Sequence, residues 1–369
     1  MMSRTAAFTV FAIVTATVVI THTAGETAAT PPTWNSRAAA AYLDARMQWW
    51  LQWPNAARDH DTACVSCHTA VPYALARPAL RSALHESELA APQRTMLGHV
   101  AKRVRMWKEV EPFYPDQTRG LPKSSESRGT EAVLNALVLS AHDAAAGSLS
   151  DDTRAAFGNM WSLQFKAGDL KGAWAWLNFH YEPWESTESA YYGAALAALA
   201  VGMAPAAYAS TPSIKEPLDL LREYLRRGVE KQRLFNQLAV VWAATKLPGL
   251  LTEAQRRAIV ESAVSKQRDD GGWSMSALGS WQRIDGSAQE VASDGYATAL
   301  IVVALRDAGP MAGEPIGKAT EWLVRHQDPS TGRWTAASLN KARDPESDAG
   351  KFMSDAATAY AALALSQPR

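Results

Sequence analysis

The two cysteines of this 369-residue chain are Cys64 and Cys67, in the stretch TACVSCHT, and His68 directly follows the second one. Two thiols three positions apart can each add to one vinyl group of a single haem, and the imidazole that follows can bind the iron as its proximal ligand. Cys-x-x-Cys-His is the attachment pattern of c-type haems. The pattern therefore predicts one covalent haem c, bound by Cys64, Cys67 and His68.

Three other interpretations of this motif stay open. A redox-active Cys-x-x-Cys pair normally begins a helix within a βαβ unit, a pattern that this sequence does not show. A structural zinc site needs two more ligands, for which Asp61 or a distant histidine could serve, although no spacing indicates one. The third interpretation is a chance placement. A disulfide between the two cysteines would close a loop too short to stabilise the chain much, so stability does not explain the pair.

The N-terminus indicates the compartment. Arg4 precedes an apolar run that ends at Ile20, and small residues at 23–25 form a cleavage site. These are the parts of a secretory signal peptide, residues 1–25; the alternative is an uncleaved N-terminal anchor. We therefore expect a periplasmic or otherwise extracytoplasmic protein with an N-terminal linker at residues 26–40, in a compartment where c-type haems are attached.

The composition excludes some classes of partner. Lysine plus arginine and aspartate plus glutamate both number 37, so the formal net charge is zero. The chain thus has neither the basic excess that favours nucleic acid nor a polybasic block for anionic lipid. No apolar stretch after the signal peptide is long enough to cross a membrane. We expect no nucleic-acid partner and no stable membrane span after signal cleavage; the sequence does not identify a redox partner protein or a small-molecule substrate.

Apolar segments that begin with polar residues recur along the chain, at intervals of roughly fifty to sixty residues. They are residues 128–141, 186–201, 234–247, 293–305 and 354–365. Each is apolar nearly all round, as in a helix buried on both faces, and amphipathic helices alternate with them. With one earlier inner helix that starts at the cysteine motif, six outer/inner helical hairpins result. Strand patterns are almost absent. The sequence therefore predicts an all-α fold, an (α/α)6 toroid, as a single domain over residues 41–369.

Three connections carry a glutamine, then glycine and tryptophan, before an inner helix. They read QFKAGDLKGAW, QRDDGGW and QDPSTGRW, at residues 164–174, 267–273 and 327–334. In these stretches the chain resembles the terpenoid cyclase and prenyltransferase superfamily, whose squalene cyclase-like members are α/α toroids. The resemblance implies that fold, with the tryptophans as core residues that wedge between hairpins.

The resemblance does not extend to the chemistry of that superfamily. The Asp-x-Asp-Asp motif with which its cyclases protonate an alkene is missing, which argues against terpenoid cyclase activity. Its zinc-dependent prenyltransferases need a cysteine ligand, and none remains outside the Cys-x-x-Cys-His motif. A fold by itself assigns no activity, so the function must be argued from the site.

The cysteine motif lies where the chain passes from an outer to an inner helix, and the long connections fall on that same rim. Long loops on a rigid scaffold often carry binding residues. The most aromatic connection, GAWAWLNFHYEPWEST, contains His180, Trp184 and Glu185. We nominate His180 as the distal iron ligand or a residue of the haem pocket, and we expect Trp184 and Glu185 to pack against haem propionates or a substrate. The other ligand candidates on this rim are His60, Met275 and Met353.

These observations predict an exported c-type haem-binding protein that acts in electron transfer or in haem-dependent redox chemistry. A haem-dependent oxidoreductase would leave the sixth iron position open to a substrate or peroxide, so whether the protein is an enzyme stays open. The alternative function is a toroid that binds an apolar or glycan-like ligand without haem. In that case the cysteine pair is redox-active or structural.

Overall fold

The first helix begins within the segment that we expected to be a linker. The computed structural model describes residues 33–306 and 312–366, so the predicted signal peptide and residues 26–32 lie outside the described residues. Helix α1 (Ser36–Gln52) starts where the side chain of Asn35 accepts a hydrogen bond from the backbone N–H of Ala38 at 3.0 Å. A side-chain oxygen at this position satisfies one of the free N–H groups of a helix start.

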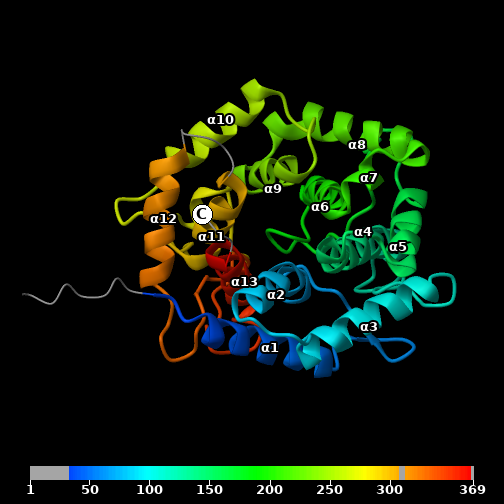
Figure 1. Ribbon diagram of the computed structural model, residues 1–369. Helices are drawn as coiled ribbons and strands as arrows, with labels where there is room; N and C mark the ends of the chain where they lie inside the picture. Colours follow the sequence, from blue (N-terminus) through cyan, green and yellow to red (C-terminus); the bar gives the residue numbers. More distant parts are fainter. Residues whose placement is uncertain (1–32, 307–311, 367–369) are drawn as a thin grey trace, which may run out of the picture. The chain divides into compact units, whose positions relative to one another are not determined.

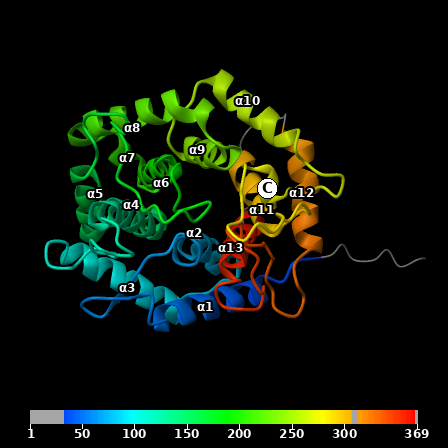
Figure 2. The same ribbon diagram turned by 180° about the vertical axis from the view of Figure 1, so that it is seen from behind.

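In the part of the chain that the structure describes, six outer and six inner helices form two concentric rings (Figures 1 and 2). The outer helices are α1, α3 (Ala91–Arg105), α5 (Asp151–Ser162), α8 (Lys215–Gly228), α10 (Glu253–Val264) and α12 (Gly313–Arg325). The inner helices are α2 (Ala70–Ala83), α4 (Ser124–Asp143), α6 (Ser189–Met203), α9 (Leu234–Lys246), α11 (Gly295–Leu305) and α13 (Phe352–Ser366). Each inner helix packs against the next, and α13 packs against α2, which closes the ring. The predicted all-α toroid of six hairpins is confirmed.

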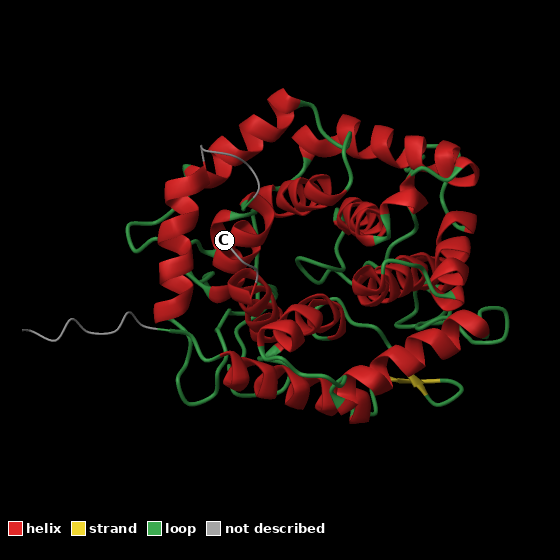
Figure 3. Cartoon of the chain, in the orientation of Figure 1, coloured by secondary structure: helices red, strands yellow, loops and turns green. Residues whose placement is uncertain are grey.

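The other elements in residues 33–306 and 312–366 are short. They are α7 (Ala206–Ala209), the 3-10 turns η1 (Ala144–Ala146), η2 (Pro212–Ile214), η3 (Val229–Lys231) and η4 (Met275–Ala277), and the strands β1 (Ala57–Arg58) and β2 (Thr62–Ala63). The two strands pair antiparallel, and Figure 3 shows this hairpin outside the helical rings. None of the described helices combines the length and the apolar character that crossing a membrane requires.

The apolar patterns of the two rings explain their burial. All residues of α11 are buried, because small and branched apolar side chains cover the whole circumference of this inner helix. In the outer helix α8 the buried residues are Leu218, Leu221, Tyr224 and Leu225, which share one face. An apolar stripe of this kind is typical of a helix that packs on a core with its other face in water.

The glutamine and tryptophan of the repeated connections have defined structural roles. Gln267 donates from Nε2 to the carbonyls of Gly271 and Pro315, both at 2.8 Å, and so ties its own turn to the next outer helix. The buried indole of Trp273 donates from Nε1 to the carbonyl of Ala263, at the end of the preceding outer helix, at 2.8 Å. The same bonds join Gln164 to Gly172 and Pro217, Gln327 to Gly332 and Asn35, Trp174 to Met160, and Trp334 to Leu323. The prediction that these tryptophans are core residues is confirmed.

The last repeat closes the outer ring onto the first helix. Gln327 accepts a hydrogen bond from the N–H of Asn35 at 2.6 Å and donates to its carbonyl at 2.9 Å. Gly332 has a φ of +76°, and a Cβ atom at this position would lie 2.3 Å from the carbonyl carbon of Ala38. Only glycine fits this close approach of the last connection to α1.

Most connections from outer to inner helices are long, as the sequence predicted. They are residues 53–69, 106–123, 163–188, 265–294 and 326–351, and the exception is the short connection 229–233. The described connections in the opposite direction, such as 84–90 and 247–252, are short. The rim that carries the cysteine motif therefore also carries nearly all of the irregular chain.

Candidate cofactor-binding site

The cysteine motif precedes the first inner helix rather than forming its first turn. Helix α2 begins at Ala70, and residues 64–66 are irregular. The hydroxyl of Ser66 accepts hydrogen bonds from the N–H groups of Thr69 at 3.3 Å and Ala70 at 3.1 Å. These bonds satisfy N–H groups at the start of the helix, so Cys67 and His68 lie in the turn that leads into it. The prediction that the helix starts at the motif is therefore wrong by a few residues.

The hairpin β1–β2 positions the motif against the helices. The N–H of Cys64 donates to the carbonyl of Ala56 at 2.8 Å, and the indole of Trp50 donates to the carbonyl of Cys64 at 2.7 Å. Arg103, on α3, binds Asp59 at 2.8 Å and the hydroxyl of Thr62 at 3.0 Å. The segment that enters the motif is thus bound to two outer helices.

A cavity of about 310 Å³ lies beside the motif. It is lined by Cys64, Cys67 and His68, and by Trp184 and Glu185 from the aromatic connection. Further lining comes from Arg119, Arg343, Phe352 and Met353. The structure therefore brings five of the six nominated site residues to one cavity, from parts of the sequence more than a hundred residues apart.

His180 and two of the other ligand candidates lie elsewhere. His180 is exposed and does not line this cavity, so the structure does not bring it together with the motif. His60 lies in the turn between the two strands, where its Nδ1 is 2.9 Å from Asp59. Met275 lines a different cavity, with Asp294. Met353 is buried and lines the cavity of the motif. The nomination of His180 stays a prediction, with Met353 as its competitor.

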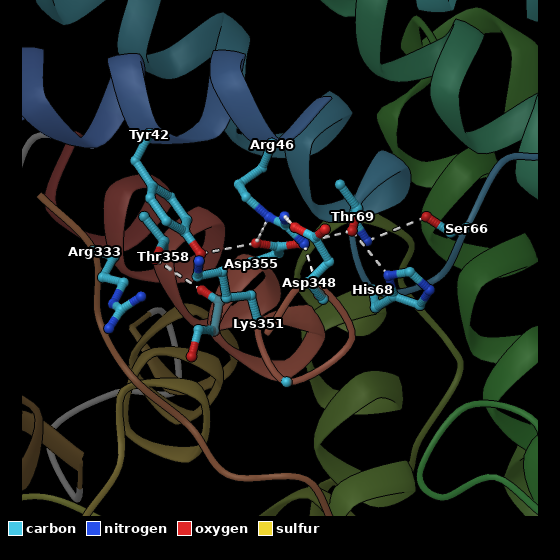
Figure 4. A network of polar contacts seen from close by, with 12 residues as sticks. Tyr42, Arg46, Ser66, His68, Thr69, Arg333, Asp348, Lys351, Asp355 and Thr358 are labelled. Atoms are coloured by element: carbon cyan, nitrogen blue, oxygen red, sulfur yellow. Dashed lines mark hydrogen bonds and ion pairs between the residues drawn. The ribbon is translucent and has the colours of Figure 1, made fainter. Parts of the chain in front are cut away.

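Aromatic rings and one hydrogen bond hold the imidazole of His68. Its ring stacks on Phe352 with 3.8 Å between centroids and meets Trp50 edge-on at 4.9 Å. Nδ1 lies 2.8 Å from the hydroxyl of Thr69 (Figure 4), whereas none of the described residues forms a hydrogen bond with Nε2. Burial, and to a lesser degree the charge of Arg46, lowers the pKa of His68 to about 3. The imidazole is therefore neutral at physiological pH, which is the form that binds a metal.

Both cysteines are free thiols whose side chains are buried, with residue exposures of 7% for Cys64 and 3% for Cys67. Burial raises the pKa of the Cys64 thiol to about 12; Arg58 opposes the rise and the carboxylate of Glu185 adds to it. Burial and Glu185 also raise the pKa of Cys67 well above its ordinary value. A redox-active pair uses a thiolate of low pKa, and burial shifts the pKa of both thiols in the opposite direction.

Trp184 and Glu185 face the motif from the connection 163–188. The indole of Trp184 lies 5.9 Å from the imidazole of His68 between centroids and donates to the hydroxyl of Tyr296 at 3.0 Å. Burial raises the pKa of Glu185 to about 7, although Arg119 and Lys123 oppose the rise. The cavity thus holds one carboxyl group that titrates near neutral pH.

The residues around this cavity fit the predicted cofactor better than a zinc ion. Between residues 33 and 306 and between 312 and 366, no group of three or more histidine, cysteine, aspartate and glutamate residues is placed to hold a metal ion. The motif instead offers two thiols and one neutral imidazole, next to aromatic rings and the cations Arg119 and Arg343. The cavity volume of about 310 Å³ is at the lower end of the roughly 300 to 1,000 Å³ of ligand pockets.

Comparisons with known proteins add little to this description. No model of a protein family matches the sequence, and no curated protein shows significant similarity to it. Among solved structures, the type II terpene cyclase MstE from Scytonema is 12% identical, with a TM-score of 0.44, over 90% of this chain and 98% of that chain. A possible member of the GH105 family from Klebsiella pneumoniae is 11% identical, with a TM-score of 0.35, over 90% of this chain and 81% of that chain. Scores this low transfer no residue roles, so the toroid assignment rests on the helices described above.

Proposed function

We propose that this protein is an extracytoplasmic, squalene cyclase-like toroid that binds one haem c covalently, and that it acts in electron transfer or haem-dependent redox chemistry. One observation carries the proposal: the two cysteines of the chain and the histidine that follows them line a single cavity. The Nδ1 side of that histidine is held by Thr69, and Nε2 has no hydrogen bond with residues 33–306 or 312–366.

Several residues of the cavity have a role in this proposal. Cys64 and Cys67 form the two thioether bonds, and Nε2 of His68 binds the iron. Arg119 and Arg343 offer positive charge to the propionates, and the aromatic side chains exclude water. Haem supplies a one-electron couple, and the protein sets its potential through the axial ligands, the hydrogen bonds to them and burial.

Two spectroscopic measurements test the proposal. The chain is produced with export and haem-attachment machinery, next to a Cys64→Ser/Cys67→Ser variant. We expect a c-type band in the reduced-minus-oxidised spectrum of the unaltered protein, and none from covalent haem in the variant. Equal spectra for both would contradict the assignment of the motif. Replacing His180 and Met353 in turn then identifies the sixth ligand, and rapid CO binding to the ferrous protein would indicate an open position, as an oxidoreductase needs.

A second candidate is favoured by the aromatic walls of the cavity, which suit an apolar ligand without haem. Thiol titration of the unfolded protein separates the two functions, because thioether-bound cysteines do not react. Two reactive thiols per chain, after production with the attachment machinery, would support the non-haem binding module.

A further inference from the structure

His68 is the first member of a chain of hydrogen bonds that runs away from the cavity into the protein (Figure 4). Nδ1 of His68 lies 2.8 Å from the hydroxyl of Thr69, and that hydroxyl donates to Oδ2 of Asp355 at 2.8 Å. Oδ1 of Asp355 accepts from Nε of Arg46 at 2.8 Å and from the hydroxyl of Tyr42 at 2.9 Å. Asp355 lies 286 positions after Thr69, so these hydrogen bonds link the cysteine motif to the last inner helix, α13.

The partners of Asp355 fix the direction of these bonds. Three donors converge on its two oxygens, as on an ionised carboxylate, which can only accept. The hydroxyl of Thr69 uses its one proton on Asp355 and is left with lone pairs for His68. Nδ1 of His68 must then carry the imidazole proton, which leaves the lone pair on Nε2.

The neighbouring repeat forms its hairpin without a carboxylate at the position that corresponds to Asp355. In α11 the hydroxyl of Thr298 accepts from the N–H of Trp273, and in α13 the hydroxyl of Thr358 accepts from the N–H of Trp334. This shared hydrogen bond aligns the two repeats. In this alignment Ser354 takes the place of Asp294, and both side chains accept from the N–H two residues after that tryptophan. Asp355 takes the place of Gly295, which has no side chain.

Stability does not explain this buried group either. Asp355 and Arg46 are both buried, with exposures of 2% and 7%. Removing two charges from water costs about as much as their attraction returns, and well-packed apolar residues often serve equally well. A partnered carboxylate beneath the histidine is, in contrast, the arrangement that orients a metal-binding imidazole and makes it a stronger donor.

We propose that Thr69 and Asp355 are positioning residues of the cofactor site. They hold His68 in the Nδ1–H tautomer and present Nε2 to the cavity as an electron-rich ligand. This tautomer is a property of the polypeptide alone. Its consequence for a bound cofactor rests on the proposed function: a stronger donor stabilises the ferric state and lowers the reduction potential.

The tautomer is tested first, on the full chain produced without haem-attachment machinery. Selective 15N-histidine labelling distinguishes the two tautomers by the chemical shifts of the ring nitrogens, and a His68→Gln variant assigns the signal. We expect the Nδ1–H form in the unaltered protein and in Thr69→Ser, which keeps the hydroxyl, and its loss in Thr69→Val. An Nε2–H form in the unaltered protein overturns the proposal without any variant.

The electronic consequence is tested on the haem-loaded protein. Changes in the partners of metal ligands typically alter affinity about 10- to 100-fold. A tenfold loss of ferric preference in Thr69→Val corresponds to a rise of about 59 mV in the midpoint potential. We expect Thr69→Ser to restore the original potential. Thr245→Val is the matched control, because it makes the same substitution on α9, where the hydroxyl of Thr245 donates to the carbonyl of Trp242 and does not line the cavity.

Two outcomes contradict the inference, and the first of them does not depend on the proposed function. An Nε2–H tautomer in the haem-free chain refutes the positioning role even if the protein binds haem. An unchanged potential in Thr69→Val refutes the effect on the ligand. A chain that shows the Nδ1–H tautomer but retains no haem refutes the proposed function and leaves the positioning role supported.

Discussion

Arg103 offers the sharpest test of how the motif is positioned. Its side chain is fully buried and donates from Nε to Glu131 at 2.6 Å. It also binds Asp59 and Thr62, in the hairpin that leads into Cys64. The substitution Arg103→Met keeps the apolar part of the side chain and removes the charge. It therefore leaves the carboxylate of Glu131, which is fully buried, without its main partner.

The structure gives the expected size of this effect. Removing one member of a buried ion pair typically costs about 3 to 5 kcal/mol, because the other charge stays buried. The remaining cation near Glu131 is Arg128, whose Nη1 is 3.9 Å from the carboxylate and compensates little of that cost. Replacing both partners by apolar residues is often neutral, so we expect Arg103→Met/Glu131→Leu to recover most of the loss.

Urea unfolding of residues 26–369, followed by circular dichroism, measures these differences. Arg105→Met is the matched control, since Arg105 lies on the same helix and pairs with Asp152 with its own side chain 68% exposed. We expect the control to leave the unfolding midpoint nearly unchanged. The reasoning is refuted if Arg103→Met costs no more than the control, or if the double substitution is no more stable than Arg103→Met alone.

Three further predictions concern the connections of this rim and the closure of the ring. A Cβ atom on Gly193 would lie 2.1 Å from the indole of Trp176, so Gly193→Ala should lower the free energy of unfolding by about 1 to 3 kcal/mol, whereas Gly158→Ala, with open space around it, should not. Gln327→Ala removes the hydrogen bonds that join the last repeat to the first helix, and thermal unfolding should show a loss of about 1 to 3 kcal/mol. Because burial raises the pKa of Glu185 from 4.5 to about 7, the haem-free chain loses stability as the pH rises from about 4.5 to about 7. Each unit of pKa shift corresponds to about 1.4 kcal/mol of stability, and partial solvent screening reduces this contribution. At pH 8.5 we therefore expect Glu185→Gln to be more stable than the unaltered protein by about 1 to 3 kcal/mol. At pH 5 the difference should be much smaller.

The helical pattern made the fold predictable. Inner helices such as α11 are apolar on every side, and the repeated glutamine and tryptophan mark where three of the six outer helices end. The predicted domain begins at residue 41, whereas α1 begins at Ser36, after the recognisable cap Asn35. The predicted start of α2, at the cysteine motif, is too early. The hydroxyl of Ser66 accepts from the N–H of Ala70, so the helix begins only after His68.

The site was only partly predictable. The spacing of Cys64, Cys67 and His68 is a local signal, and the aromatic connection pointed to Trp184 and Glu185. The contacts of His68 with Phe352 and, through Thr69, with Asp355 depend on the closing of the ring. Residues so far apart in sequence have no pattern that pairs them. A comparison of the repeats offers one signal: Asp355 stands where the neighbouring repeat has Gly295.

A pyridine haemochrome spectrum after acid–acetone extraction tests the central claim most directly. The protein is produced with export and haem-attachment machinery, and the Cys64→Ser/Cys67→Ser variant is the control. If the cavity is a covalent haem site, haem stays with the unaltered polypeptide, gives the c-type band, and is extracted from the variant. If the unaltered polypeptide retains no haem, the assignment is contradicted, and the cavity is a binding site of another kind.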